Sequence, residues 1–169
     1  MNKGLGSQVN PPKTVQLRPA AAADEPFLMR VYASARAQEL AVVPWDERQK
    51  QAFVEMQFAA QVQHYRTHYP SAQQLVICAD DKPVGRLYLD KRPAEIRILD
   101  IAVLSENRKA GIGTLVLGNI LNDALAACLP VTIYVESFNP SLPFLERLGF
   151  RKIEQDEFNV LMKWDPAGG

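Results

Sequence analysis

The chain has 169 residues, with 19 Lys or Arg balanced by 19 Asp or Glu, so its formal net charge is zero. This length suits a domain that buries about 70% of the surface its unfolded form exposes. Zero net charge excludes a general attraction to nucleic acid or to anionic membranes. The sequence contains no run of about 18 apolar residues, and its opening MNKGLGSQVNPPK lacks a signal peptide's apolar centre. We therefore expect a cytoplasmic protein that binds neither nucleic acid nor membrane.

The two ends of the chain differ from its middle in composition. Residues 1–12 combine Gly, Ser, Asn and two prolines with few apolar side chains, and the last five residues read DPAGG. Such segments bury too little apolar surface to offset the entropy lost on ordering. We expect a mobile N-terminal segment over residues 1–12 and a single domain over residues 13–165.

The two cysteines indicate a reducing compartment. Cys78 lies in an apolar stretch and Cys128 at the end of a helical one, and neither has a His or Cys close by in the sequence. This arrangement matches neither a metal site nor a disulfide framework. We interpret both as buried core residues.

Hydrophobic periodicity predicts the elements of the first half. Residues 14–18 form a short strand, and two helices follow, over residues 24–40 and from the Pro-Trp-Asp sequence at 44–46 to about residue 69. Three strand patterns then occur at residues 75–79, 84–89 and 95–104, separated by short turns. Short turns join antiparallel neighbours, so these strands form a meander.

The second half predicts a parallel strand pair. A helix ends before Pro130, and its apolar stripe comprises Leu117, Ile120, Leu121, Ala124, Leu125 and Cys128. A strand follows at residues 131–136, and a strand–helix–strand unit places its strands parallel. Asn139 and Pro140 suit the N-cap and first turn of a short helix ending at Gly149, and residues 158–164 form a last strand. The fold class is α/β of the α+β type, with a mixed, mostly antiparallel sheet of six to seven strands flanked by about four helices.

The sequence RKAGIG, at residues 108–113, connects the apolar run LDIAVL to the next helix. Its backbone amides precede the positive end of that helix, and Gly111 and Gly113 carry no side chain, so the loop is suited to bind a phosphate group. Arg108 and Lys109 add positive charge at its rim. The alternative is an ordinary helix entry with two flexible residues. The sequence has neither a GxxxxGK[ST] run nor a GxGxxG fingerprint, which argues against ATP and NAD.

Four sequence features resemble the GNAT superfamily of acyl-CoA-dependent N-acyltransferases. They are the strand LDIAVL, the loop RKAGIG in the place of the family's Gln/Arg-x-x-Gly-x-Gly/Ala signature, the strand VTIYVES and the segment NPSLPFLERLGF. Their order and spacing agree with the family over residues 95–150, and the order of the elements agrees from residue 14 to residue 164.

The resemblance implies an N-acetyltransferase that moves an acetyl group from acetyl-CoA directly to a primary amine. The parallel strands would splay apart at their carboxyl ends and admit acetyl-CoA as co-substrate, with its pyrophosphate on the loop amides and its pantetheine along exposed strand backbone. The cofactor-binding residues are then Ile101, Ala102, Val103, Arg108, Lys109, Ala110, Gly111, Ile112, Gly113, Thr114 and Asn139. The amine acceptor is open, and a homodimer is compatible with the resemblance.

Asp100 is the first candidate for the general base that an amine nucleophile requires. It interrupts an otherwise apolar strand, and strand alternation places it on one face with Ile98 and Ala102. An ionised carboxylate there is costly without a partner or a water. The alternative is a structural ion pair with Arg97 or Arg86.

Glu136 is the second candidate base, and Tyr134 is a candidate for donating a proton or positioning a water. Both lie on the face of their strand opposite to the apolar residues of the stretch 131–135. The alternatives are a solvated strand end for Glu136 and a packing role for Tyr134. The resemblance adds a backbone amide near Val103 that stabilises the reacting carbonyl oxygen.

One position departs from the family pattern. Many members carry a Tyr in the helix before LGF, where its hydroxyl protonates the departing thiolate. Here that position is Leu145, preceded by Phe144, and neither side chain donates a proton. Either water or another residue supplies the proton, or the domain is a catalytically silent acyl-CoA-binding module.

His64 and His68 are four residues apart on one helix, which is a metal-ligand spacing. The Glu of an HExxH motif is missing between them and the sequence suggests no third ligand, so we expect no metal. With Tyr65 and Tyr69, these residues border the acceptor pocket or lie at the surface. Trp45 is a further pocket candidate, with core packing as the alternative.

Overall fold

A seven-stranded mixed sheet forms the centre of the protein in the computed structural model, which describes residues 10–168. The strands lie in the order β1-β2-β3-β4-β5-β7-β6, and only β4 and β5 are parallel neighbours. Their bounds are β1 Val15–Pro19, β2 Gln73–Ala79, β3 Lys82–Lys91, β4 Ile96–Val103, β5 Val131–Glu136, β6 Arg151–Gln155 and β7 Asn159–Trp164. The predicted fold class is confirmed.

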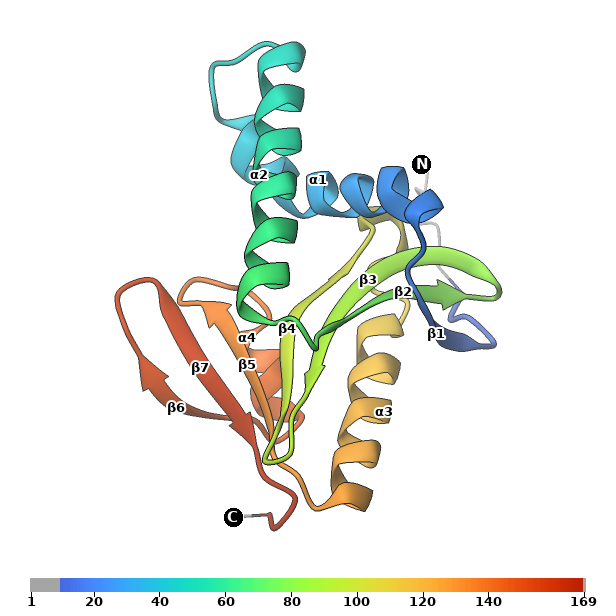
Figure 1. Cartoon of the computed structure of the whole chain (residues 1–169), viewed down its shortest axis with the longest axis vertical. Helices are drawn as coiled ribbons and strands as arrows, with labels where there is room; N and C mark the ends of the chain where they lie inside the picture. Colours follow the sequence, from blue (N-terminus) through green and yellow to red (C-terminus); the bar gives the residue numbers. More distant parts are fainter. Residues whose placement is uncertain (1–9, 169) are drawn as a thin grey trace, which may run out of the picture.

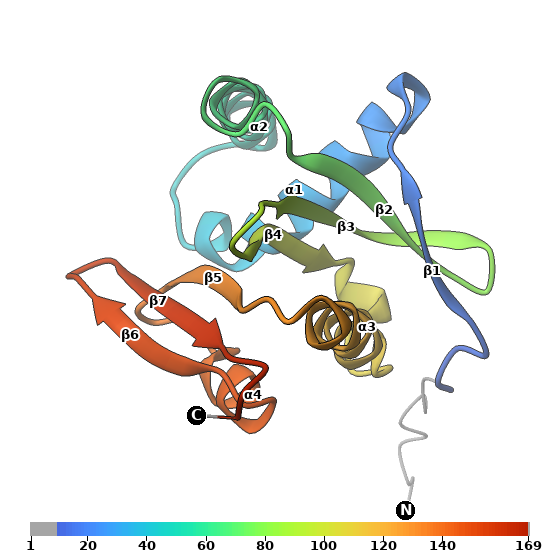
Figure 2. The same ribbon diagram turned by 60° about the horizontal axis from the view of Figure 1, so that its bottom comes forward.

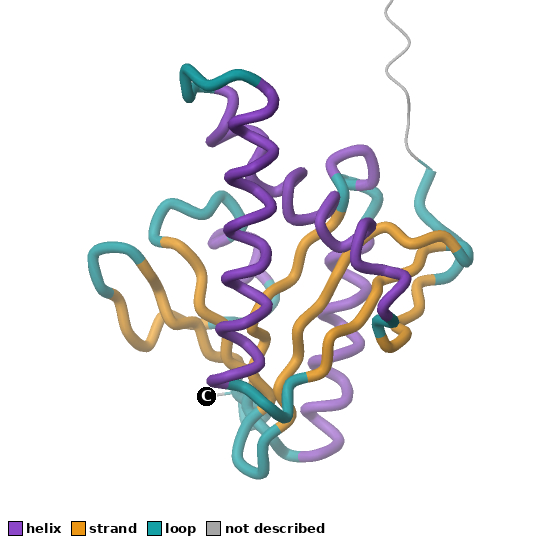
Figure 3. The backbone as a smooth tube through the Cα atoms, turned by 45° about the horizontal axis from the view of Figure 1, so that its top comes forward, coloured by secondary structure: helices purple, strands orange, loops and turns teal. Residues whose placement is uncertain are grey.

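Within residues 10–168, four α-helices flank the sheet, namely α1 (Glu25–Ala41), α2 (Glu47–His68), α3 (Ile112–Ala127) and α4 (Leu142–Arg147). Helices α1 and α2 cover one face of strands β1 to β4, and α3 packs against the opposite face (Figures 1 and 2). In Figure 3, α2 runs lengthwise over the strands, and its connection to α1 extends beyond the end of the sheet. The two buried apolar clusters fill the two layers, which fixes the sheet between them.

The parallel strands β4 and β5 pair over only part of their length. The pairing joins residues 96–98 of β4 to residues 131–133 of β5. Beyond it, β4 stays paired with β3 as far as Val103, while β5 stays paired with β7 as far as Glu136. The carboxyl ends of β4 and β5 therefore separate, and within the described residues the β4 edge facing the gap has no strand partner after Ile98.

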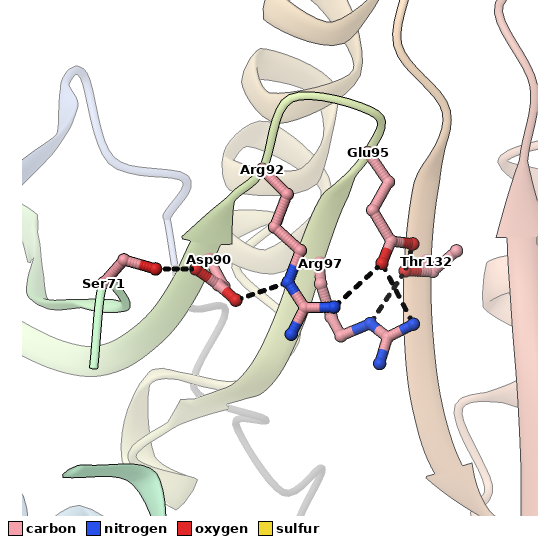
Figure 4. Close-up of polar contacts among 6 residues, drawn as sticks. All are labelled: Ser71, Asp90, Arg92, Glu95, Arg97 and Thr132. Carbon is pink, nitrogen blue, oxygen red and sulfur yellow. Dashed lines mark hydrogen bonds and ion pairs between the residues drawn. The ribbon is translucent and has the colours of Figure 1, made fainter. Parts of the chain in front are cut away.

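A polar network holds β4 and β5 together at the opposite end, where their pairing begins (Figure 4). Thr132 of β5 donates to Glu95 at 2.7 Å, and Arg97 of β4 contacts the same carboxylate at 3.0 Å. Arg92 links Glu95, at 3.3 Å, to the buried Asp90, at 2.7 Å. The strands are thus tied at their amino ends, so that separation is confined to their carboxyl ends.

A β-bulge at Leu99 decides the side of the sheet on which Asp100 lies. The pairing register with β3 shifts after Tyr88, which makes Leu99 the extra residue. Ile98 belongs to the buried cluster beneath α3, whereas Asp100 and Ala102 line a cavity on the side of α1 and α2. The prediction that Asp100 and Ile98 share a face is wrong, because it assumed unbroken alternation.

Two helix predictions are wrong at their ends. Cys128 was expected on the buried stripe of α3 but is exposed, because α3 ends at Ala127 and Cys128 follows it as the C-cap with a left-handed φ of 54°. Leu125 was expected on the same stripe, and it lies within α3 but is exposed. The N-cap of α4 is Ser141 rather than Asn139, since the Asn139 Oδ1 accepts a hydrogen bond from the Ser141 amide at 2.9 Å. The side chain of Asn139 therefore forms a turn ahead of the helix.

Strand β6 is an element that the sequence analysis missed. All five of its residues are exposed, so RKIEQ has no buried alternation. It becomes a strand only through its pairing with β7 at the sheet edge. Cys78 is buried as predicted.

The terminal and location predictions have different outcomes. Residues 1–9 of the segment predicted to be mobile lie outside the described residues. Between residues 10 and 168, no helix combines the length and the apolar character needed to cross a bilayer. The single domain over residues 13–165, the cytoplasmic location and the homodimer stay predictions.

Candidate active site

A cavity of about 390 Å³ opens where β4 and β5 separate. Its walls come from α1 and α2 on one side, from residues 99–103 of β4 and 133–136 of β5, and from the start of α4. Eight of the predicted site residues line it, namely Asp100, Ile101, Ala102, Val103, Gly113, Tyr134, Glu136 and Asn139. The structure therefore brings all three candidate catalytic residues into one cavity with part of the predicted cofactor-binding set.

The remaining cofactor-binding candidates form the adjoining loop and the first turn of α3. The side chains of Ala110 and Ile112 are buried in the core, which anchors the loop and leaves its backbone available. Lys109 and Gly111 both take a left-handed φ, of 66° and 79°. The other two members, Arg108 and Thr114, lie at the start of the loop and in the first turn of α3.

The loop presents a run of unpaired backbone donors. The amides of residues 109–114 donate to no acceptor within the described part of the chain, and the first main-chain bond of α3 runs from the Leu115 amide to the Gly111 carbonyl. A Cβ built on Gly113, which lines the cavity, would meet no atom within 4 Å. These features fit an anion bound at the positive end of a helix.

The Arg108 side chain contacts the end of β4. Its Nε donates to the Val103 carbonyl at 3.0 Å, so it covers the end of β4. The guanidinium still lies at the junction between β4 and the loop. Its charge is therefore near the predicted phosphate site, although one donor is already used.

Asp100 is paired with Arg86, one of the two arginines weighed as structural partners. The Arg86 Nη2 lies 2.6 Å from the Asp100 Oδ2, and the Asp100 side chain keeps 23% of its surface exposed. Burial raises the pKa of the Asp100 carboxyl, and the charge of Arg86 opposes that shift. A carboxylate whose pKa is raised above the ordinary range and that faces a cavity is suited to accept a proton.

Tyr65 supports the bulge that places Asp100. Its hydroxyl donates to the carbonyl of the bulged residue Leu99 at 3.2 Å, and its ring packs on Tyr88, with the ring centroids 4.7 Å apart. Burial raises the pKa of the Tyr65 phenol, so this hydroxyl stays protonated as a donor. Helix α2 thereby fixes the backbone next to the candidate base.

Tyr134 and Glu136 lie on the exposed face of β5, as predicted. Tyr134 is 49% exposed, and the Arg97 guanidinium lies 5.5 Å from its ring centroid. An Arg36 nitrogen of α1 lies 3.9 Å from a Glu136 carboxylate oxygen, so the two side chains face each other across the cavity. Both β5 residues can reach a molecule between α1 and β5.

The position of the missing family tyrosine is apolar in the structure as well. Leu145 is 2% exposed, and both it and Phe144 line the cavity. Ser141, nearby in the same wall, donates its hydroxyl proton to Asn139 at 2.6 Å. The described cavity lining contains two phenols, Tyr134 on β5 and Tyr32 on α1.

The two histidines and Trp45 lie outside the cavity. His64 and His68 are exposed on α2 with their rings 4.3 Å apart, and Trp45 packs on Phe53. Across the described part of the chain, no three His, Cys, Asp or Glu side chains form a group that could hold a metal ion.

Several cavity residues were not proposed as site residues from the sequence, and four of them surround Asp100 or contact its partner. Tyr32 and Arg36 come from α1, Gln61 from α2 and Arg86 from β3. Of these four, Arg86 carried a signal in the sequence, because it is a charged residue within the apolar stretch VGRLYL. The other three lie on ordinary amphipathic helices, and their sequence neighbours do not distinguish them.

The family model described as the acetyltransferase (GNAT) family matches residues 35–150. That match covers more than half of the chain, and this protein belongs to the GNAT acetyltransferase family. No functionally curated protein matched the sequence.

Solved structures support the same fold. The PaiA N-acetyltransferase from Thermoplasma acidophilum, solved with coenzyme A, is 16% identical with a TM-score of 0.66, and the match covers 90% of this chain and 99% of that one. An acetyltransferase from Thermus thermophilus is 18% identical with a TM-score of 0.64, covering 90% and 97%. The ribosomal-protein-S18-alanine N-acetyltransferase from Escherichia coli is 15% identical with a TM-score of 0.58, covering 90% and 94%. At these identities the likeness concerns the fold.

Proposed function

We propose that this protein is an N-acetyltransferase that moves an acetyl group from acetyl-CoA directly to a primary amine. The observation that carries the proposal is the placement of a candidate base, Asp100, in the same cavity as an unpaired strand edge and next to a run of free loop amides. Family membership supports the acyl transfer, and the coenzyme A bound to the Thermoplasma relative supports the choice of donor.

Three parts of the chain would hold the acetyl donor. The amides of residues 109–114, at the positive end of α3, fit its pyrophosphate. The unpaired edge of β4 at residues 101–103 fits the amide groups of its pantetheine arm. Asn139 lines the opposite wall. When bound, the co-substrate supplies a thioester acyl group where the carboxyl ends of β4 and β5 separate.

The chemistry forms a C–N bond between the amine and the acyl carbon and breaks the C–S bond of the thioester. Asp100 accepts the proton that the amine loses, and Glu136 is the second candidate for this role. A main-chain amide near Val103 stabilises the negative charge on the acyl oxygen. Holding both reactants in one cavity supplies much of the acceleration, on the order of 7–11 kcal/mol of the barrier.

The departing thiolate needs a proton, and Leu145 cannot supply it. Tyr134, which faces the cavity from β5, is our candidate donor, directly or through a water. The rival function, a silent acyl-CoA-binding module, is motivated by the same apolar position.

Two measurements test the proposal. Calorimetry with coenzyme A measures binding, and a thiol-release assay with acetyl-CoA over a broad panel of amines measures turnover. We expect binding and turnover, with Asp100→Asn reducing kcat far more than Glu136→Gln. Binding without turnover for any amine would favour the silent module, and the absence of binding would exclude both functions.

A further inference from the structure

Arg86 is a buried cation in the wall of the acceptor cavity. The residue is 2% exposed, and both of its polar side-chain partners contact the same nitrogen. Nη2 donates to the Gln61 Oε1 at 2.8 Å and lies 2.6 Å from the Asp100 Oδ2. Nε and Nη1 have no hydrogen-bond partner within residues 10–168. These donors belong to a buried charge in a cavity wall, where leaving them unpaired is costly.

A second guanidinium lies on the same aromatic ring. The Cζ atoms of Arg36 and Arg86 are each 5.2 Å from the ring centroid of Tyr32. Arg36 contacts Glu39 at 3.4 Å and Glu136 at 3.9 Å, which are longer separations than the pair at Arg86. One side of the cavity therefore gathers hydrogen-bond donors with positive charge.

The negative groups of the cavity already have cationic partners. Asp100 faces Arg86, and Glu39 and Glu136 face Arg36. The Asp100 Oδ2 makes no hydrogen bond within the described residues, but its charge is matched by the ion pair with Arg86, so the atoms left without either kind of partner are the donors Nε and Nη1 of Arg86, which a ligand oxygen would satisfy. A cavity with a carboxylate base beside unmatched guanidinium donors complements a molecule with an amine and a carboxylate on neighbouring atoms.

We propose that the amine acceptor carries a carboxylate close to its amine, as an amino acid does, and that Arg86, assisted by Arg36, binds this carboxylate. The inference depends on the acetyl transfer proposed above. In this arrangement the amine lies towards Asp100, and the carboxylate accepts from the free nitrogens of Arg86. Arg86 is then a specificity-determining residue for the acceptor.

The experiment compares matched acceptors in the thiol-release assay at saturating acetyl-CoA. Each L-amino acid of a panel is paired with the amine obtained by removing its carboxylate. Hydrogen bonds to a charged group predict a kcat/KM ratio of about 10- to 100-fold in favour of the best amino acids. Arg86→Lys and Arg36→Gln should each move this ratio towards one.

The ratio of kcat/KM between an amino acid and its matched amine does not change when part of the protein is unfolded, because both acceptors are assayed with the same enzyme preparation. Arg30→Gln is the matched control, since Arg30 lies on α1, is 65% exposed in its side chain and is not among the cavity residues. It should leave the ratio unchanged. Calorimetry with coenzyme A on each variant checks the acetyl-donor site separately.

The failures of the two proposals are distinguishable. Efficient acetylation of amines that lack a carboxylate, with no preference for their amino acids, would overturn the inference and leave the acetyl transfer standing. A preference that both Arg86→Lys and Arg36→Gln retain would also overturn it. Absence of turnover with every amine and amino acid would refute the proposed transfer and the inference together.

Discussion

Replacing Gly113 by Ala should raise the stability of the protein and weaken its binding of coenzyme A. Gly113 is the second residue of α3, and a Cβ there meets no atom within 4 Å, so the added methyl group creates no clash. Ala is favoured over Gly inside a helix by about 0.5–1 kcal/mol. For a domain of this size, that gain raises Tm by about 1–4 °C.

Gly113 lines the cavity next to the loop amides, so we expect the added methyl group to interfere with a phosphate bound there. Loss of one charge-assisted hydrogen bond costs about 1.5–3 kcal/mol, which weakens binding about 10- to 100-fold. Gly113→Asp adds a negative charge at the phosphate site and should weaken binding further. Thermal denaturation measures the first effect, and calorimetry with coenzyme A measures the second.

Gly118 provides the matched control, because it lies in the same helix, also has open space around its Cβ position and is not among the cavity residues. Gly118→Ala should raise Tm similarly and leave affinity for coenzyme A unchanged. Gly111 is less suited, since its φ of 79° makes any side chain cost about 1–2 kcal/mol of backbone strain. If Gly113→Ala binds coenzyme A as tightly as Gly118→Ala does, the loop does not hold the phosphates.

Three further predictions concern the base, the bulge and a surface ion pair. Burial raises the pKa of Asp100, so kcat/KM should increase with pH in a range above the ordinary pKa of Asp. If Asp100→Asn shows the same increase of kcat/KM with pH, another group is the base. Tyr65→Phe removes the hydrogen bond to the Leu99 carbonyl and should lower the free energy of unfolding by about 1 kcal/mol. The same variant should reduce kcat more than it changes KM, whereas the control variant Tyr69→Phe should not affect kcat. Hydrogen bonds from Arg18 and the Ala21 amide lower the pKa of Asp24 from 3.8 to about 2. Because this folded-state pKa is depressed, the stabilisation is present above pH 3.8 and lost as pH falls towards about 2. Urea denaturation should show this acid-side loss in the wild type and in Asp123→Asn, and its persistence in Asp24→Asn would contradict the assignment.

Local patterns predicted most of the elements around the site. Strand β5 was predicted with the bounds that the structure has, because its apolar residues alternate with Tyr134 and Glu136 on the other face. The strand-to-helix connection was predicted at residues 108–113, because its glycines are visible in one stretch of sequence, and α3 begins within this stretch, at Ile112. Strand β6 was missed because its exposed residues carry no such pattern, and its pairing partner follows later in the chain.

The sequence by itself determined the order of the elements other than β6, the phosphate-binding candidate loop and the candidate base, because these depend on short-range periodicity and on residue types that are unusual in their setting. Only the tertiary structure decided how the cavity is charged. The bulge at Leu99 turned Asp100 towards α1 and α2, and chain segments distant in sequence brought Arg86, Tyr32 and Arg36 around it. Contacts between distant segments depend on how whole elements pack, and the periodicity within one segment does not predict that packing.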